Sequence, residues 1–156
     1  MAGESFIWKA FSKLNCRIFS KYDTVQIPEY FGANMIIITA TLSFETEKDR
    51  NETVAKTAAV QAATRNDEPG CLAYCFAPDP AEPTHIQVYE LWTDVDNLAA
   101  HFDHPNYAAM VEVLHGCDGF LASENRLYLS EDRGPVYGPD KKFRFDAVSG
   151  GFKSHN

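Results

Sequence analysis

The residues with the clearest chemical potential lie in the run ELWTDVDNLAAHFDHPNY, from Glu90 to Tyr107. Val88, Glu90 and Trp92 alternate along a predicted strand, so the three side chains share one face. A carboxylate on a buried face is costly unless it is paired or used. His101 follows near the end of a short predicted helix, and imidazole exchanges protons near neutral pH. The run therefore predicts a pocket with an indole wall and a proton-accepting imidazole.

Two tyrosines can add phenol hydroxyl groups to this pocket. Tyr74 lies on the preceding predicted strand, and Tyr107 lies on the helix that follows His101. Trp92 also fits a hydrophobic core without any chemical role, and that explanation stays open at the level of sequence.

Glu90 and the histidines have alternative explanations as well. Glu90 could pair with Arg126 or Lys56. His101 and His104 are three residues apart and could suggest a metal site, but no third ligand has a suitable spacing. We therefore expect no metal. Phosphate-binding glycine loops and dinucleotide fingerprints are also missing from the sequence.

Composition narrows the class of protein. A chain of 156 residues fits one domain, and 45% hydrophobic residues can fill a core. The net charge of −8 excludes general affinity for nucleic acid, because no excess of basic residues can neutralise phosphates. The four cysteines follow no zinc spacing and indicate reduced thiols in a cytoplasmic protein. They are Cys16, Cys71, Cys75 and Cys117.

The elements that must position the candidate residues follow the order β-α-β-β-α-β. The predicted strands are 35–44, 71–77, 85–92 and 120–129, and the predicted helices are 45–66, 94–102 and 105–114. We expect the long helix to bury a stripe of Val54, Ala58, Gln61 and Ala62. Right-handed crossovers then give an α+β, ferredoxin-like fold, in which a four-stranded antiparallel sheet carries its helices on one face.

The second face of this sheet lacks a cover. Ile37, Tyr89 and Leu91 should point away from the helices. An apolar face of this kind is normally buried, and a second copy of the chain is the simplest partner. We therefore expect a homodimer that forms through this face.

The domain of residues 35–129 has an extension at each end. Residues 1–34 combine a predicted amphipathic helix with a connector. One side of the helix is basic, with Lys9, Lys13, Arg17 and Lys21, and another side is apolar, with Ile7, Phe11, Leu14 and Ile18. We favour docking of this helix on the domain or its partner over contact with a membrane surface or a targeting role. Residues 130–156 are rich in glycine and proline and predict an irregular tail.

The middle of the chain resembles the antibiotic biosynthesis monooxygenase family. The similarity rests on Glu90-Leu91-Trp92 followed by Asp96, Leu98, His101 and Pro105-Asn106-Tyr107, and on Glu68-Pro69-Gly70-Cys71 before the second strand. The resemblance implies a dimeric ferredoxin-like fold with a pocket between sheet and helices. Some members oxygenate polyphenols or quinols without any cofactor, whereas others degrade haem or isomerise small sugars. Trp92 and His101 match family positions.

Three positions depart from subsets of the family. Asn106 stands where many quinol-oxidising members have histidine, and Val88 and Leu98 stand where oxygenases of aromatic polyketides have asparagine and tyrosine. Two functions remain in view. The first is a cofactor-independent monooxygenase of a phenol or quinol; the second is a non-catalytic or stress-associated dimer that binds a small hydrophobic molecule.

The enzyme hypothesis gives each candidate residue a role. His101 accepts a proton, Trp92 stacks on the aromatic substrate, and Tyr74 and Tyr107 orient its oxygen atoms. The expected substrate-binding residues are Tyr74, Glu90, Leu98, Asn106 and Tyr107.

Overall fold

The computed structural model describes residues 35–145 and residue 147. Its elements are β1 (Met35–Phe44), α2 (Glu47–Asp67), β2 (Cys71–Pro78), β3 (His85–Trp92), α3 (Val95–Asp103), α4 (Pro105–His115) and β4 (Phe120–Ser130). The predicted order is confirmed, because alternating β-branched and aromatic residues, capping residues and Pro-Gly breaks locate each element.

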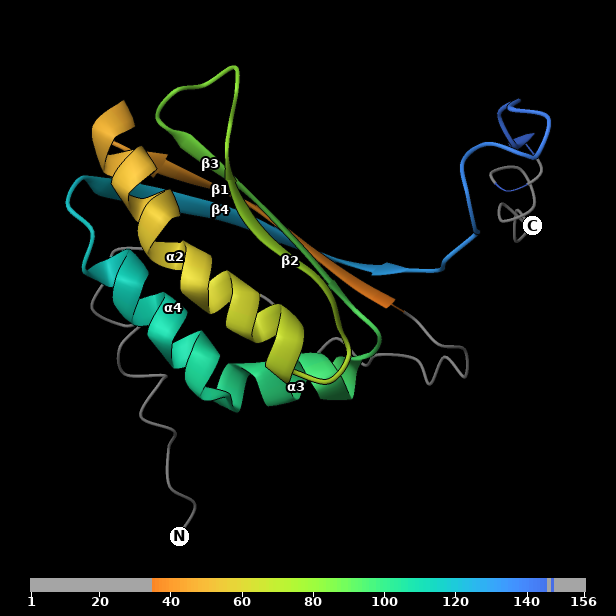
Figure 1. Ribbon diagram of the computed structural model, residues 1–156, viewed down its shortest axis with the longest axis horizontal. Coiled ribbons are helices and arrows are strands. Elements are labelled where there is room, and N and C mark those ends of the chain that lie inside the picture. Colours follow the sequence, from red (N-terminus) through yellow and green to blue (C-terminus); the bar gives the residue numbers. More distant parts are fainter. Residues whose placement is uncertain (1–34, 146, 148–156) are drawn as a thin grey trace, which may run out of the picture.

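The four strands form one antiparallel sheet in the order β2-β3-β1-β4. Figure 1 shows α2, α3 and α4 together on one side of this sheet. The arrangement confirms the predicted α+β, ferredoxin-like fold. Its central strands, β1 and β3, bring Ile36 opposite Trp92 and Ile38 opposite Glu90.

The hydrophobic core lies between the sheet and the helices. Its buried members from the strands are Ile36, Leu42, Phe44, Tyr74, Phe76, Ile86, Val88 and Trp92, and Leu98 and Met110 come from the helices. Val88 and Trp92 lie on the same buried face of β3, as their alternation along the strand predicted. The core therefore surrounds the predicted site residues.

The buried face of α2 differs from the predicted apolar stripe. Ala58 and Ala62 are exposed, whereas the side chains that face the sheet are mainly polar. These buried residues are Arg50, Thr53, Thr57, Gln61 and Thr64. Threonine fits here because its hydroxyl can bond to the helix backbone, as Thr53 Oγ1 does to the carbonyl of Asp49 at 2.8 Å.

Gln61 joins α2 to the outer edge of the sheet. Its Nε2 donates to the carbonyl of Phe76 at 3.3 Å, and its Oε1 accepts from the Phe76 amide at 3.0 Å. One side chain thus satisfies both backbone groups of a residue on the edge strand β2, which buried polar groups require.

The opposite sheet face carries the predicted partner-binding residues. Ile37 lies across from Leu91 and Thr39 across from Tyr89, on the side away from the helices. A hollow of about 210 Å³ on this face is lined by Thr39, Ala40, Thr41, Gln87, Glu124 and Arg126. The single chain leaves Tyr89 exposed. The homodimer stays a prediction.

The two ends are described unequally. The expected N-terminal helix and connector lie outside the described residues. After β4 the described chain has one isolated bridge between Tyr137 and Phe143, and residues 145 and 147 are helical; its other residues are irregular. Within residues 35–145 and 147, helices with the length and apolar character needed to cross a bilayer do not occur.

Candidate functional site

His101 lies in the last turn of α3, directly above the sheet. Asp94 caps the first turn of α3 by accepting from the Asn97 amide at 2.8 Å, which fixes where the helix begins. His101 then falls on the inner side of the helix, where its ring is only 2% exposed. A histidine this deeply buried needs polar partners or a functional reason.

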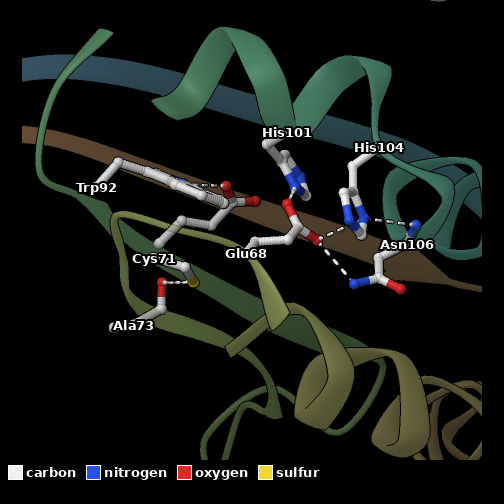
Figure 2. Close-up of polar contacts among 8 residues, drawn as sticks. Glu68, Cys71, Ala73, Trp92, His101, His104 and Asn106 are labelled. Carbon is white, nitrogen blue, oxygen red and sulfur yellow. Dashed lines mark hydrogen bonds and ion pairs between the residues drawn. The ribbon is translucent and has the colours of Figure 1, made fainter. Parts of the chain in front are cut away.

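Glu68 supplies one of those partners. The residue forms the C-terminal cap of α2, and its side chain is buried. Its Oε2 lies 2.6 Å from Nδ1 of His101, as Figure 2 shows. An ionised carboxylate only accepts hydrogen bonds, so Nδ1 carries the proton in this contact. The neutral ring then presents a free lone pair at Nε2, for which the described residues provide no hydrogen-bond partner.

The second carboxylate oxygen of Glu68 connects the site to α4. Asn106 Nδ2 donates to Oε1 at 3.0 Å, and His104 Nδ1 lies 3.4 Å from the same oxygen (Figure 2). His104 is also the N-cap of α4, where its Nδ1 accepts from the Asn106 amide at 3.2 Å. Glu68 therefore links the end of α2 with both short helices.

Aromatic rings surround His101 on the remaining sides. Its ring centroid lies 4.7 Å from that of Trp92, 5.4 Å from Tyr74, 5.3 Å from Tyr107 and 5.7 Å from Phe102. Trp92 and Tyr74 are almost fully buried, whereas Phe102 is 42% exposed. Among these rings Phe102 is the one that reaches furthest into solvent.

Glu90 bonds to the indole and not to a basic residue. Its Oε2 accepts from Trp92 Nε1 at 3.1 Å, and no ion pair with Lys56 or Arg126 forms in the described chain. The alternative in which Glu90 pairs with Lys56 or Arg126 therefore does not apply. Burial raises the pKa of Glu90 to about 7, and the nearby charge of Glu68 adds to this effect, while the Trp92 hydrogen bond opposes it.

Burial also governs the other titratable groups. It lowers the pKa of His101, against the opposing effect of the Glu68 hydrogen bond and charge, so the neutral imidazole is favoured. Burial raises the pKa of the Tyr74 and Tyr107 hydroxyls, which keeps both protonated. The site therefore holds one neutral base among hydroxyl groups that can donate hydrogen bonds.

The structure brings most of the predicted site residues together. Trp92, Tyr74 and Tyr107 contact His101, and Glu90 contacts Trp92. Two expected substrate-binding residues have other contacts beside the site. Leu98 is buried in the hydrophobic core. Asn106 directs its amide to Glu68.

Glu68 was missed as a site residue. The available signal was its position at the start of the Glu68-Pro69-Gly70-Cys71 motif, where a helix ends beside the second strand. Thr93 donates its amide hydrogen to the Gly70 carbonyl at 2.9 Å, which holds this turn against the end of β3. The turn places Glu68 next to the residues that follow Trp92.

The arrangement can take a proton from a weak acid inside an apolar environment. His101 supplies the acceptor atom, and Glu68 can stabilise the positive charge that proton uptake creates. Within residues 35–145 and 147, we find no cluster of three or more His, Cys, Asp or Glu side chains that could hold a metal ion.

Comparisons with solved structures place this fold among known ones. A protein from Deinococcus radiodurans assigned as an antibiotic biosynthesis monooxygenase superposes with a TM-score of 0.57 at 21% identity, over 66% of this chain and 99% of the other. A protein with the same assignment from Nitrosomonas europaea has a TM-score of 0.55 at 18% identity, over 65% of this chain and 94% of the other. Another from Caulobacter crescentus has a TM-score of 0.52 at 24% identity, over 64% of this chain and 92% of the other. These likenesses support the fold.

Sequence comparison assigns the family. Among curated proteins, none matches this chain. The family model described as antibiotic biosynthesis monooxygenase matches residues 35–113, which is just over half of the 156 residues. This range contains Glu68, Trp92 and His101. The chain therefore belongs to the antibiotic biosynthesis monooxygenase family.

Proposed function

We propose that this protein is a monooxygenase that acts on a small phenol or hydroquinone and needs no cofactor. The observation that carries the proposal is the state of His101, whose Nδ1 is held by Glu68 while Nε2 has no partner in the described chain. Family membership supports the same reaction class. Activity, substrate and the residue roles below belong to the proposal.

The proposed reaction begins with proton transfer. The substrate gives its acidic proton to Nε2 of His101, and the electron-rich anion that remains reduces O₂. A bond forms between a ring carbon and one oxygen atom. Protonated His101 returns its proton to the resulting peroxide, the same ring carbon loses its hydrogen as a proton, and the O–O bond breaks. One oxygen atom stays in the product as a carbonyl, and the other leaves as water with these two protons. The substrate itself provides the electrons, so atoms and charge balance.

The surrounding residues would bind and orient the substrate. Trp92 would stack on its ring, and the hydroxyls of Tyr74 and Tyr107 would donate hydrogen bonds to its oxygen atoms. His101 and Trp92 are almost fully buried, so a substrate can reach them only if neighbouring side chains move. Exclusion of water would then protect the reactive anion.

Aerobic turnover of defined probes tests the proposal. The probes are 1,4-naphthohydroquinone and anthrone, and the measurements are oxygen uptake above the protein-free rate and the incorporation of one ¹⁸O atom from ¹⁸O₂. We expect His101→Gln, which can still bond to Glu68 but is not basic, to lower turnover by roughly 10²–10⁴-fold. His115→Gln, the same change at an exposed histidine, is the control. Equal turnover by His101→Gln and wild type would exclude His101 as the base.

A non-catalytic ligand-binding dimer is the second candidate. Val88 and Leu98 favour it, because both are buried in the core and supply no polar group to the site. This candidate predicts that the same probes quench Trp92 fluorescence and raise thermal stability, while oxygen uptake stays at the protein-free rate. Uptake that depends on His101 would exclude it.

A further inference from the structure

The orientation of Glu68 is fixed by contacts besides the one to His101. Its Oε1 accepts from Asn106 Nδ2 at 3.0 Å and lies 3.4 Å from His104 Nδ1. This leaves Oε2 to meet His101 Nδ1 at 2.6 Å. The carboxylate is buried with only 3% of its side chain exposed, so solvent scarcely competes for these contacts.

We propose that Glu68 is the positioning residue of the site, which fixes the tautomer and orientation of His101 and stabilises its protonated form, and that Asn106 holds Glu68 in place. The proposal rests on the function proposed above. It assigns Asn106 to the carboxylate and not to the substrate. His101 remains the residue that touches the substrate.

The physical reasoning follows from charge and hydrogen bonding. A carboxylate that accepts from Nδ1 makes the Nε2 lone pair the only basic position of the ring. Once Nε2 takes a proton, the imidazolium and the carboxylate form a neutral buried pair. Without the negative charge, a buried imidazolium would be far less stable, so proton uptake would be weaker.

Other polar and titratable groups also surround the His101 ring. Tyr74 on β2 and Tyr107 on α4 contact the His101 ring, and Glu90 on β3 bonds to the indole beside it. His104 lowers the pKa of His101 by repulsion, whereas Glu68 raises it. Removal of Glu68 should therefore change the His101 titration in one defined direction.

Two substitutions at Glu68 separate charge from hydrogen bonding. Glu68→Gln keeps an acceptor for Nδ1 but loses the charge, so we expect the Nδ1-protonated tautomer to persist while the pKa of His101 falls by about 1–3 units. Glu68→Leu removes the acceptor too, and the tautomer should become mixed. Asn106→Leu should shift the pKa in the same direction by a smaller amount. Glu112→Gln, on the exposed side of α4, is the control.

The readout is the ¹⁵N spectrum of the histidine ring as a function of pH, assigned by loss of the signal in His101→Gln. If the probes are turned over, the acid limb of kcat/KM should move to lower pH in Glu68→Gln, because the neutral base then persists to lower pH. Near-UV circular dichroism checks folding, and Asn106→Leu provides the test should both Glu68 variants unfold.

An unchanged His101 tautomer and pKa in the folded Glu68 and Asn106 variants would overturn the proposal. A shift of the His101 pKa in the Glu68 variants alone would contradict the role proposed for Asn106. The spectrum does not depend on turnover. Absence of oxygen uptake in the wild type would therefore count against the proposed function, whereas the ring titration alone decides the role of Glu68.

Discussion

The indole nitrogen of Trp92 donates its hydrogen bond to Glu90, two residues earlier on the same face of β3, at 3.1 Å. Both side chains are buried. A pair of this kind satisfies the indole N–H and gives the Glu90 carboxyl group a donor. Burial nonetheless outweighs this donor and raises the pKa of Glu90.

Glu90 should make folding stability depend on pH. Its pKa is raised from 4.5 to about 7, so the folded chain keeps a proton that the unfolded chain loses over this range. The unfolding free energy should therefore fall as the pH rises from about 4.5 to 7. Glu90→Gln should flatten this fall by roughly 2–3 kcal/mol, as measured by urea unfolding at several pH values. Glu112→Gln should keep the wild-type slope; an unchanged slope in Glu90→Gln would contradict the prediction.

Phe102 should control access to His101. It contacts the rings of both His101 and Tyr107, and it is 42% exposed. Phe102→Ala should therefore speed the modification of His101 by diethylpyrocarbonate about tenfold or more, because the reagent must reach Nε2. Peptide mass spectrometry measures the rate. Phe143→Ala, at a similarly exposed tail residue, should have no effect, and an equal rate in Phe102→Ala would show that access runs elsewhere.

The open sheet face should form the dimer interface. Tyr89→Lys places a charge at the middle of this face, where burial against a second copy would be costly. We expect the wild type to be a dimer at micromolar concentration and the variant to be a monomer in light scattering. Val95→Lys, on the helical layer, should remain dimeric. A monomeric wild type would rule out this assembly.

The N-terminal segment should stabilise the domain. Residues 5–22 carry four basic residues and no acidic one, whereas residues 35–145 carry eighteen acidic and nine basic residues, so charge favours docking. Deletion of residues 1–22 should lower Tm by several degrees in calorimetry. Replacement of the four basic residues by Gln should have a smaller effect if the apolar stripe carries the contact. If deletion changes neither Tm nor assembly, a membrane or targeting role gains support.

The strands could be predicted because their patterns are unambiguous. β1 and β3 begin and end at the predicted residues, since alternation assigns one face to the core wherever one face is buried. The buried face of α2 could not be predicted by the same logic. Thr53 and Thr57 are polar by type, yet their hydroxyls bond within the helix and both residues are fully buried.

The sequence predicted most residues of the site but not the contacts between them. His101 and Trp92 follow one another closely, so a short helix after a strand must bring them together. Glu68 lies 33 residues before His101, and local spacing cannot show that a turn folds its carboxylate against that ring. The role of Asn106 could not be predicted for the same reason, because it depends on the contact with Glu68.

The two edges of this sheet differ, because the Gln61 side chain makes two hydrogen bonds to the backbone of Phe76 on the edge strand β2. They occupy backbone groups on the outer side of β2, so an incoming strand finds no free donor or acceptor at that position. β4 is the opposite edge; Leu127 and Leu129 are exposed there, and no described strand lies beyond it. Gln61 therefore makes pairing with a foreign strand less favourable at the β2 edge than at the β4 edge. Loss of Gln61 would free the backbone groups of Phe76. Foreign strands could then pair at both edges of the sheet, which is the condition for open-ended polymerisation.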